Sequence, residues 1–236
     1  MQILMSRMRA AMEKYNMIED GDIIAVGVSG GKDSLALLYA LAEMRRFYPK
    51  KYNVKAITAD MGFFGNKTDF SEITALCDKL GVEHIIRETE LYHIIFETRK
   101  ETNPCSLCAR MRRGILHDMT KEEGCTKLAL GHHMDDAAET FMMNLLSGGR
   151  IESFRPVTYL SRKDLTMIRP MIFATEKEVI SAAKKMSLPT VESPCPEDKT
   201  SNRNDMKELL AVLEKDYPAL KEKITGGLQK ANLSGW

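Results

Sequence analysis

The residues best suited to chemistry form a glycine-rich turn near the start of the chain. The run Ser29-Gly30-Gly31-Lys32-Asp33-Ser34 follows a short apolar segment and precedes a helical pattern. Glycines let backbone N–H groups approach phosphate oxygens, and the N-terminus of the following helix favours negative charge. Lys32 and the hydroxyls of Ser29 and Ser34 can add hydrogen bonds. The turn therefore predicts an ATP-phosphate site, in which we include the preceding Val28.

The turn differs from a Walker A loop, because Val26 stands where that loop needs glycine and Asp33 follows Lys32 where it needs Ser or Thr. It resembles instead the motif of the PP-loop ATP pyrophosphatases. The resemblance implies that the turn cradles the β- and γ-phosphates of ATP and that pyrophosphate is released. It also implies that Asp60, after the second predicted strand, lies near the adenine or ribose.

Cysteines form a second candidate site. Cys105 and Cys108 lie three residues apart at a predicted helix start, and Cys195 lies between two prolines. Thiols so spaced can hold one metal centre, and a helix N-terminus stabilises thiolates. Three thiolates could bind zinc, or a 4Fe-4S cluster with one iron left open, while simple burial of the two spaced thiols is the alternative. Cys77 and Cys125 fall within helical patterns and are expected in the core.

Several motifs together resemble the tRNA 2-thiocytidine biosynthesis family. They are Cys105 to Leu116, Leu128 to Asp136, Gly148-Gly149, Arg169-Pro170 and Cys195. The resemblance implies adenylation of the 2-oxygen of a cytidine in the tRNA anticodon loop, followed by its replacement with sulfur. It also implies a 4Fe-4S cluster held by Cys105, Cys108 and Cys195. Some relatives carry a further cysteine where this chain has Asp198, so any such cluster here has three protein ligands.

Candidate catalytic residues come from the same resemblance. PP-loop thiolases use the first Asp of the pair Asp135-Asp136, so we expect Asp135 to be catalytic, with Gly131 and His132 near the nucleotide. Arg112 takes a position where related enzymes can carry a catalytic Lys. It could neutralise the α-phosphate together with Lys32 and Mg²⁺, although an arginine cannot act as a base.

The carboxylates that follow Asp135 have an alternative interpretation. Asp136 and Glu139 could be only a charge pair at a helix N-terminus, because acidic side chains are stabilised there. The sequence does not place His133.

Alternating strand and helix patterns must position these residues. Strands are expected over residues 22–28, 52–59, 82–87 and 127–130, and helices over residues 34–47, 68–80, 106–123, 135–146 and 175–186. This order predicts an α/β fold with a doubly wound, mostly parallel sheet, of the Rossmann-like adenine nucleotide alpha hydrolase type, and additional C-terminal helices. We divide the 236 residues into an N-terminal helix (1–20), a PP-loop ATP-binding domain (21–190) and a C-terminal helical extension (191–236) that carries the third cysteine.

Composition limits the partners. Hydrophobic residues make up 44% and charged residues 28%, the formal net charge is only +1, and no apolar run is long enough for a membrane span. A nucleic-acid partner would need a local concentration of basic residues, and Arg110, Arg112 and Arg113 could form one, although a solvated surface is the alternative. The resemblance implies a cytoplasmic protein that acts on tRNA. A sulfur donor, either a cysteine desulfurase or free sulfide, is required, and a homodimer would widen the basic surface.

Two alternative functions remain open at this point. The first is the same ATP chemistry on a uridine or a small metabolite that is thiolated or amidated. The second is a non-catalytic iron–sulfur or zinc protein that binds RNA and acts as a sensor.

Overall fold

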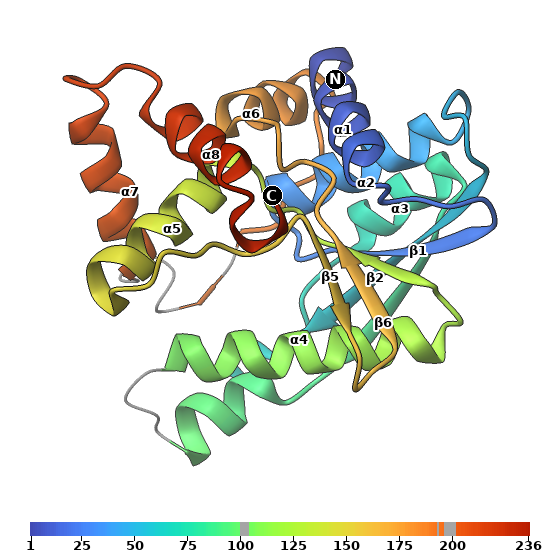
Figure 1. Cartoon of the computed structure of the whole chain (residues 1–236). Coiled ribbons are helices and arrows are strands. Elements are labelled where there is room, and N and C mark those ends of the chain that lie inside the picture. Colours follow the sequence, from blue (N-terminus) through green and yellow to red (C-terminus); the bar gives the residue numbers. More distant parts are fainter. Residues whose placement is uncertain (100–103, 193, 196–201) are drawn as a thin grey trace.

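A six-stranded sheet forms the centre of the molecule (Figure 1). The computed structural model describes residues 1–99, 104–192, 194–195 and 202–236. The strand order is β3-β2-β1-β4-β6-β5, and every pair is parallel except β5 with β6. The strands are β1 (Asp22–Gly27), β2 (Tyr52–Asp60), β3 (Glu83–Glu88), β4 (Lys127–Ala129), β5 (Val157–Leu160) and β6 (Leu165–Ile168). The prediction of a doubly wound, mostly parallel sheet is confirmed.

Helices cover both faces of the sheet (Figure 1). One face carries α1 (Gln2–Lys14), α2 (Lys32–Met44), α3 (Ser71–Leu80) and α6 (Glu176–Lys185), and the other carries α4 (Pro104–Glu122). Beside them lie α5 (Met134–Gly148), α7 (Asn202–Leu213) and α8 (Leu220–Lys230), with α5 packed against both of the others. Shorter turns of helix occupy Phe63–Gly65, His93–Thr98 and Leu233–Gly235. None of the described helices is long and apolar enough to cross a membrane.

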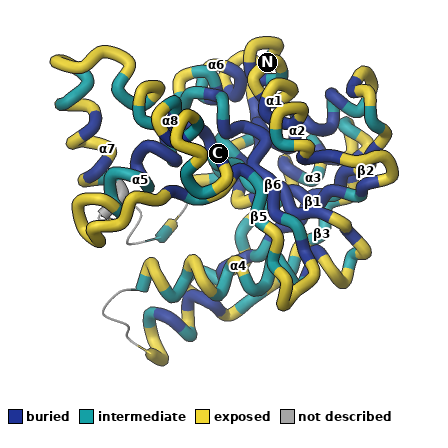
Figure 2. Tube along the Cα trace, viewed as in Figure 1, coloured by how far each residue is buried: buried dark blue, intermediate teal, exposed yellow. Residues whose placement is uncertain are grey.

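Alternation along the strands produces two separate cores. In β1, the side chains of Ile24 and Val26 are fully buried in the cluster beneath α1, α2, α3 and α6, while Ala25 between them is buried on the α4 side. This is the period of two that a strand imposes on its side chains. Figure 2 shows the resulting buried centre of the sheet with exposed outer faces on the helices. The larger core also includes Leu4 and Trp236, so it takes residues from all three predicted segments.

Local signals set most of the element boundaries. Helix α3 ends at Gly81 and α5 at Gly149, and both glycines adopt the left-handed conformation that closes a helix. Thr175 and Glu178 form a capping box at the start of α6. The hairpin β5–β6 was not predicted, because strands of four residues contain too few alternating positions to identify from the sequence.

Candidate nucleotide and thiol site

The site lies where the strand order reverses. Strand β1 has β2 on one side and β4 on the other, and ligands of open α/β sheets bind outside the carboxyl ends of strands at such a point. The glycine-rich turn leaves β1 at this edge and leads into α2, whose N-terminus is at Lys32. The helix therefore directs its unpaired N–H groups and the positive end of its dipole at the crevice.

Hydrogen bonds within the turn fix its shape. The Ser34 hydroxyl donates to the Gly31 carbonyl at 2.9 Å and accepts from the Ser29 N–H at 3.2 Å. Gly30 has a φ of +84°, and a Cβ atom there would lie 3.1 Å from the Cβ of Val191. The Gly30 carbonyl also accepts from the Val191 N–H at 3.0 Å. Only glycine fits this position, and the contact joins the turn to the segment that leads to Cys195.

Lys32 is surrounded by carboxylates. Its ammonium lies 3.1 Å from Asp33 and 3.4 Å from Glu176, and Glu176 in turn pairs with Lys207 at 2.7 Å. Burial disfavours the charge on Lys32, but Asp33 and Glu176 outweigh burial and raise its pKa. The ammonium is thus held charged at the phosphate site. Sequence analysis missed Glu176, because only the fold brings α6 to the turn.

A cavity of about 480 Å³, here called the loop cavity, opens beside the turn. Its walls include Ser29, Gly31, Lys32 and Asp33 from the turn and Asp60 from the end of β2. Cys108 and Arg112 on α4 and Cys195 line the same cavity. Residues predicted for ATP binding and for metal binding therefore line one cavity.

The three predicted metal-binding thiols are neighbours. Burial raises the pKa of the Cys108 thiol, Arg112 opposes that rise, and the nearby thiols of Cys195 and Cys105 add to it. Among the described residues, no three His, Cys, Asp or Glu side chains converge closely enough to hold a metal ion. The chemistry of the donor set fits a 4Fe-4S cluster, because such clusters are held by cysteine thiolates and all three cysteines are free. Asp198 lies outside the described residues.

Asp135, which was also predicted to be catalytic, does not line the loop cavity. Its carboxylate accepts from the backbone N–H of Glu176 at 2.7 Å and from the ammonium of Lys221 at 2.9 Å. These residues line an adjoining cavity of about 380 Å³ formed with α6 and α8. The catalytic role of Asp135 remains a prediction, and Lys221 is a partner that the sequence did not indicate.

The residue that the sequence could not place, His133, caps helix α5. Its ring accepts from the Asp136 N–H at 3.4 Å, while the Asp136 carboxylate accepts from the His133 N–H at 2.8 Å. His133 Nε2 also lies 3.8 Å from Asp33 in the glycine-rich turn. Asp136 therefore has the helix-capping role that the sequence left open.

The remaining ATP-site predictions fall around the turn. Val28 is buried, and a Cβ at Gly131 would lie 3.1 Å from the backbone of Asp33, so the loop that follows β4 packs directly against the start of α2. The ring of His132 lies 4.9 Å from that of Phe154. The buried Asp60 carboxylate accepts from the N–H groups of Gly62 and Thr68, so it fixes the segment after β2. Nucleotide contacts of these residues stay predictions.

Comparison with known proteins identifies relatives of this chain in sequence and in fold. Residues 3–213 match the PP-loop domain family. A tRNA-cytidine(32) 2-sulfurtransferase from Geobacter metallireducens is 40% identical over 221 residues, which cover 92% of this chain and 85% of that protein. The structure of a U34-tRNA thiolase from Methanococcus maripaludis with its 4Fe-4S cluster is 30% identical, with a TM-score of 0.80 over 98% of this chain and 80% of that chain. An NH3-dependent NAD synthetase from Campylobacter jejuni, 18% identical with a TM-score of 0.50, shares the fold alone.

Proposed function

Because the chain belongs to the PP-loop domain family, and within it to the tRNA-cytidine 2-sulfurtransferases, we propose that it thiolates tRNA at the expense of ATP. The substrate atom is the 2-oxygen of a cytidine in the anticodon loop, which sulfur replaces. The loop cavity supports this proposal most directly, since its walls combine the PP-loop turn with Cys108 and Cys195. One cavity can therefore hold the activating nucleotide beside the sulfur-handling thiols.

The first step is adenylation. The cytidine oxygen attacks the α-phosphorus of ATP, a new O–P bond forms, the bond to the β-phosphate oxygen breaks, and pyrophosphate leaves. The unpaired backbone N–H groups at the N-terminus of α2 and the ammonium of Lys32 stabilise the negative charge on the phosphates. Arg112 lines the same cavity, which supports a role for its guanidinium in stabilising charge on the α-phosphate.

Magnesium is expected to accompany ATP at this site. Mg²⁺ binds through one or two carboxylates together with phosphate oxygens. The Oδ1 atom of Asp33 is buried in the turn and makes no hydrogen bond within the described part of the chain, so this oxygen suits the ion. We therefore propose Asp33 as the protein ligand of Mg²⁺.

The second step replaces the activated oxygen. Hydrosulfide attacks C2 of the cytidine, the carbon that carries the adenylated oxygen. A C–S bond forms, the C–O bond breaks, and AMP leaves with no net oxidation or reduction. A 4Fe-4S cluster held by Cys105, Cys108 and Cys195 supplies an iron with an open position that can bind sulfide. The three thiols present the right ligand type, and two of them face the loop cavity.

Further partners follow from this chemistry. Arg110 and Arg113 are exposed on α4 beside Arg112, so tRNA phosphates have cations close to the cavity. The sulfur donor is free sulfide, or a cysteine desulfurase whose persulfide is reduced to hydrosulfide by an external thiol, and we expect the reaction in the cytoplasm, where tRNA is available. A homodimer would present two copies of the α4 arginines to one tRNA.

Mass spectrometry of tRNA nucleosides tests the function. In a strain that lacks this gene, 2-thiocytidine should be absent and should return with the wild-type gene. A Cys195→Ser gene should not restore it, because one cluster ligand is lost, whereas Cys125→Ser should restore it, because Cys125 is a buried core thiol. Retention of every thiolated nucleoside in the deletion strain would overturn the proposal.

The same strains and proteins separate the alternatives. An enzyme for a small metabolite would show no salt-sensitive affinity for tRNA. A non-catalytic RNA-binding sensor would release no pyrophosphate from ATP. If the deletion strain lacks a thiolated uridine instead of 2-thiocytidine, the protein carries out the proposed chemistry on a uridine.

A further inference from the structure

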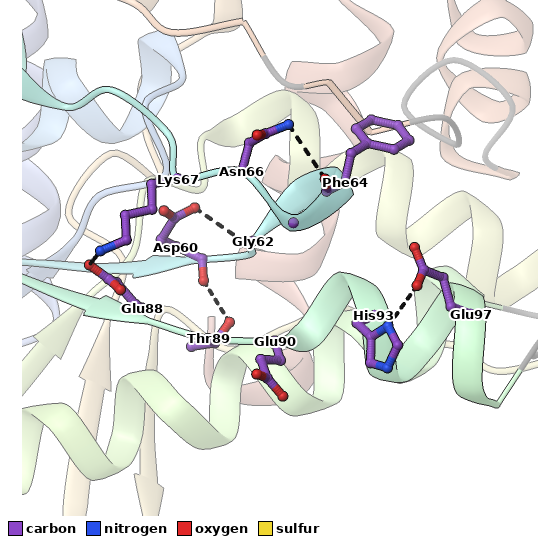
Figure 3. Close-up of a pocket in the computed structure, with 11 residues that line it drawn as sticks. Asp60, Gly62, Phe64, Asn66, Lys67, Glu88, Thr89, Glu90, His93 and Glu97 are labelled. Carbon is purple, nitrogen blue, oxygen red and sulfur yellow. Dashed lines mark hydrogen bonds and ion pairs between the residues drawn. The ribbon is translucent and has the colours of Figure 1, made fainter.

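A third cavity, here called the outer cavity, lies beside the loop cavity at the carboxyl ends of β2 and β3 (Figure 3). Its volume is about 710 Å³. Asp60 lines both cavities, and the short turn Phe63–Gly65 separates them, with Phe63 in the wall of the loop cavity and Phe64 in the wall of the outer cavity. If one nucleotide of an RNA chain occupies the loop cavity, the adjacent nucleotide can therefore reach the outer cavity.

Phe64 is held in an unusual conformation on this wall. The residue is 57% exposed and has a φ of 54°, a left-handed value that bulky side chains rarely adopt. Strained residues of this kind concentrate at functional sites. In Figure 3 the Phe64 ring points away from Asp60.

Neighbouring residues fix the strained turn from both sides. Gly62 has a φ of +64°, and a Cβ atom there would lie only 2.4 Å from the Thr89 carbonyl oxygen, so this glycine packs directly on the end of β3. Asp60, only 4% exposed, accepts from the Gly62 N–H at 3.3 Å and from the Thr68 N–H at 3.0 Å. The exposed position of Phe64 is therefore built into the fold.

Other aromatic rings support Phe64 from behind. Its ring lies 4.7 Å from the ring of Tyr92, and Tyr92 stacks on Phe96 at 5.0 Å with an interplanar angle of 24°. Tyr92 is only 8% exposed, so the set presents mainly the Phe64 ring outward. An exposed ring backed by the buried Tyr92 ring loses little conformational freedom when a flat ligand stacks on it.

We propose that Phe64 is the stacking platform for an unpaired tRNA base that neighbours the cytidine being modified. This inference rests on the proposed function, since it requires the target base to occupy the loop cavity. Proteins recognise single-stranded RNA chiefly by stacking splayed bases on aromatic side chains. The next base of the anticodon loop is the group that the outer cavity is placed to receive.

The charges of the outer cavity favour a base over a phosphate. Glu88, Glu90 and Glu97 line it, while Lys67 pairs with Glu88 at 2.6 Å and His93 pairs with Glu97 at 2.6 Å. Excess carboxylate repels the RNA backbone but accepts hydrogen bonds from the exocyclic amino groups of cytosine and adenine. The RNA backbone then runs outside the cavity, with the base directed inward.

Thiolation kinetics on an anticodon stem-loop RNA test the platform with the reconstituted protein. Phe64→Ala should raise the KM for RNA roughly 5- to 150-fold, the range expected for one lost base stack, with the KM for ATP unchanged. Phe64→Tyr should restore the wild-type KM, because it restores the ring. Phe47→Ala is the matched control, since Phe47 is 54% exposed beyond the far end of α2 and lines neither cavity.

Abasic substitutions identify the base. At the position that stacks on Phe64, removal of the base should raise the KM of the wild type as much as Phe64→Ala does and should add nothing to that variant. A Phe64→Ala protein that behaves like Phe47→Ala, or the absence of any coupled loop position, would overturn the inference. Failure of the wild type to thiolate RNA at all would instead reject the proposed function. If Phe64→Ala does not fold, Phe64→Leu carries the same test, because it keeps an apolar side chain without a ring.

Discussion

Contacts between charged residues connect the glycine-rich turn through α6 and α5 to α8. Lys32 contacts Glu176, the Glu176 N–H donates to Asp135, and Asp135 pairs with Lys221 on α8. Burial disfavours the charge on Lys221, but its bond with Asp135 outweighs burial and raises its pKa. Such a pair positions the carboxylate at the start of α5, close to the phosphate site.

The Asp135–Lys221 pair should matter for stability. Both side chains are nearly buried, at 10% and 12% exposure, so Lys221→Met leaves the Asp135 charge without its cation. We expect a loss of about 3 kcal/mol in the free energy of unfolding, measured with urea. Lys223→Met, at an exposed position of the same helix, should change it little.

A double variant provides the check on this prediction. Asp135→Asn combined with Lys221→Met should recover part of the lost stability, because no unpaired charge stays buried. Additive losses would show that the two residues act independently.

Among the elements, β2 and α3 are joined through one histidine of β3. The two ring nitrogens of His84 lie 2.9 Å from the hydroxyls of Thr58 on β2 and Thr74 on α3. Burial lowers the pKa of His84 below its ordinary value of 6.5, with Asp78 opposing that shift. This contact holds α3 against the edge of the sheet that carries the outer cavity.

Stability should therefore depend on pH through His84. Between the ordinary value of 6.5 and the lower folded pKa, the unfolded chain binds a proton that the folded protein does not, so stability falls as pH falls through this window. His84→Asn removes this dependence. The difference in unfolding free energy between wild type and variant should thus be largest above about pH 7 and shrink towards about pH 5. A difference that is constant with pH would contradict the assignment.

At the scale of the whole molecule, residues from distant parts of the chain pack around Phe154, in the segment after α5. Trp236 is 5% exposed in the larger core, and its indole N–H donates to the Phe154 carbonyl at 3.0 Å. The Phe154 ring in turn contacts His132 at 4.9 Å and the guanidinium of Arg169 at 4.9 Å. Residues far apart in sequence thereby support the loop that leaves β4.

Removal of the indole should weaken the fold as a whole. Trp236→Ala is expected to lower the free energy of unfolding by about 3 to 5 kcal/mol, because it leaves a cavity in the core and an unpaired Phe154 carbonyl. Tyr217→Ala, at a position 58% exposed, is the matched control and should have little effect. Equal midpoints of urea unfolding for the two variants would contradict this view of the core.

The sequence by itself determined the features that depend on neighbouring residues. Glycine spacing predicted the phosphate turn, and the alternation of strand and helix patterns predicted the parallel sheet. These signals are local, because turn geometry, caps and periodicity act within a few residues.

Tertiary structure alone decided which distant side chains meet. It placed Glu176 beside Lys32, Lys221 beside Asp135, and Cys195 in one cavity with Cys108. It also turned Phe64 outward on a strained turn, which no pattern in the sequence indicates. Such contacts arise from the packing of whole elements, and the energy of packing depends on positions in space that sequence spacing does not encode.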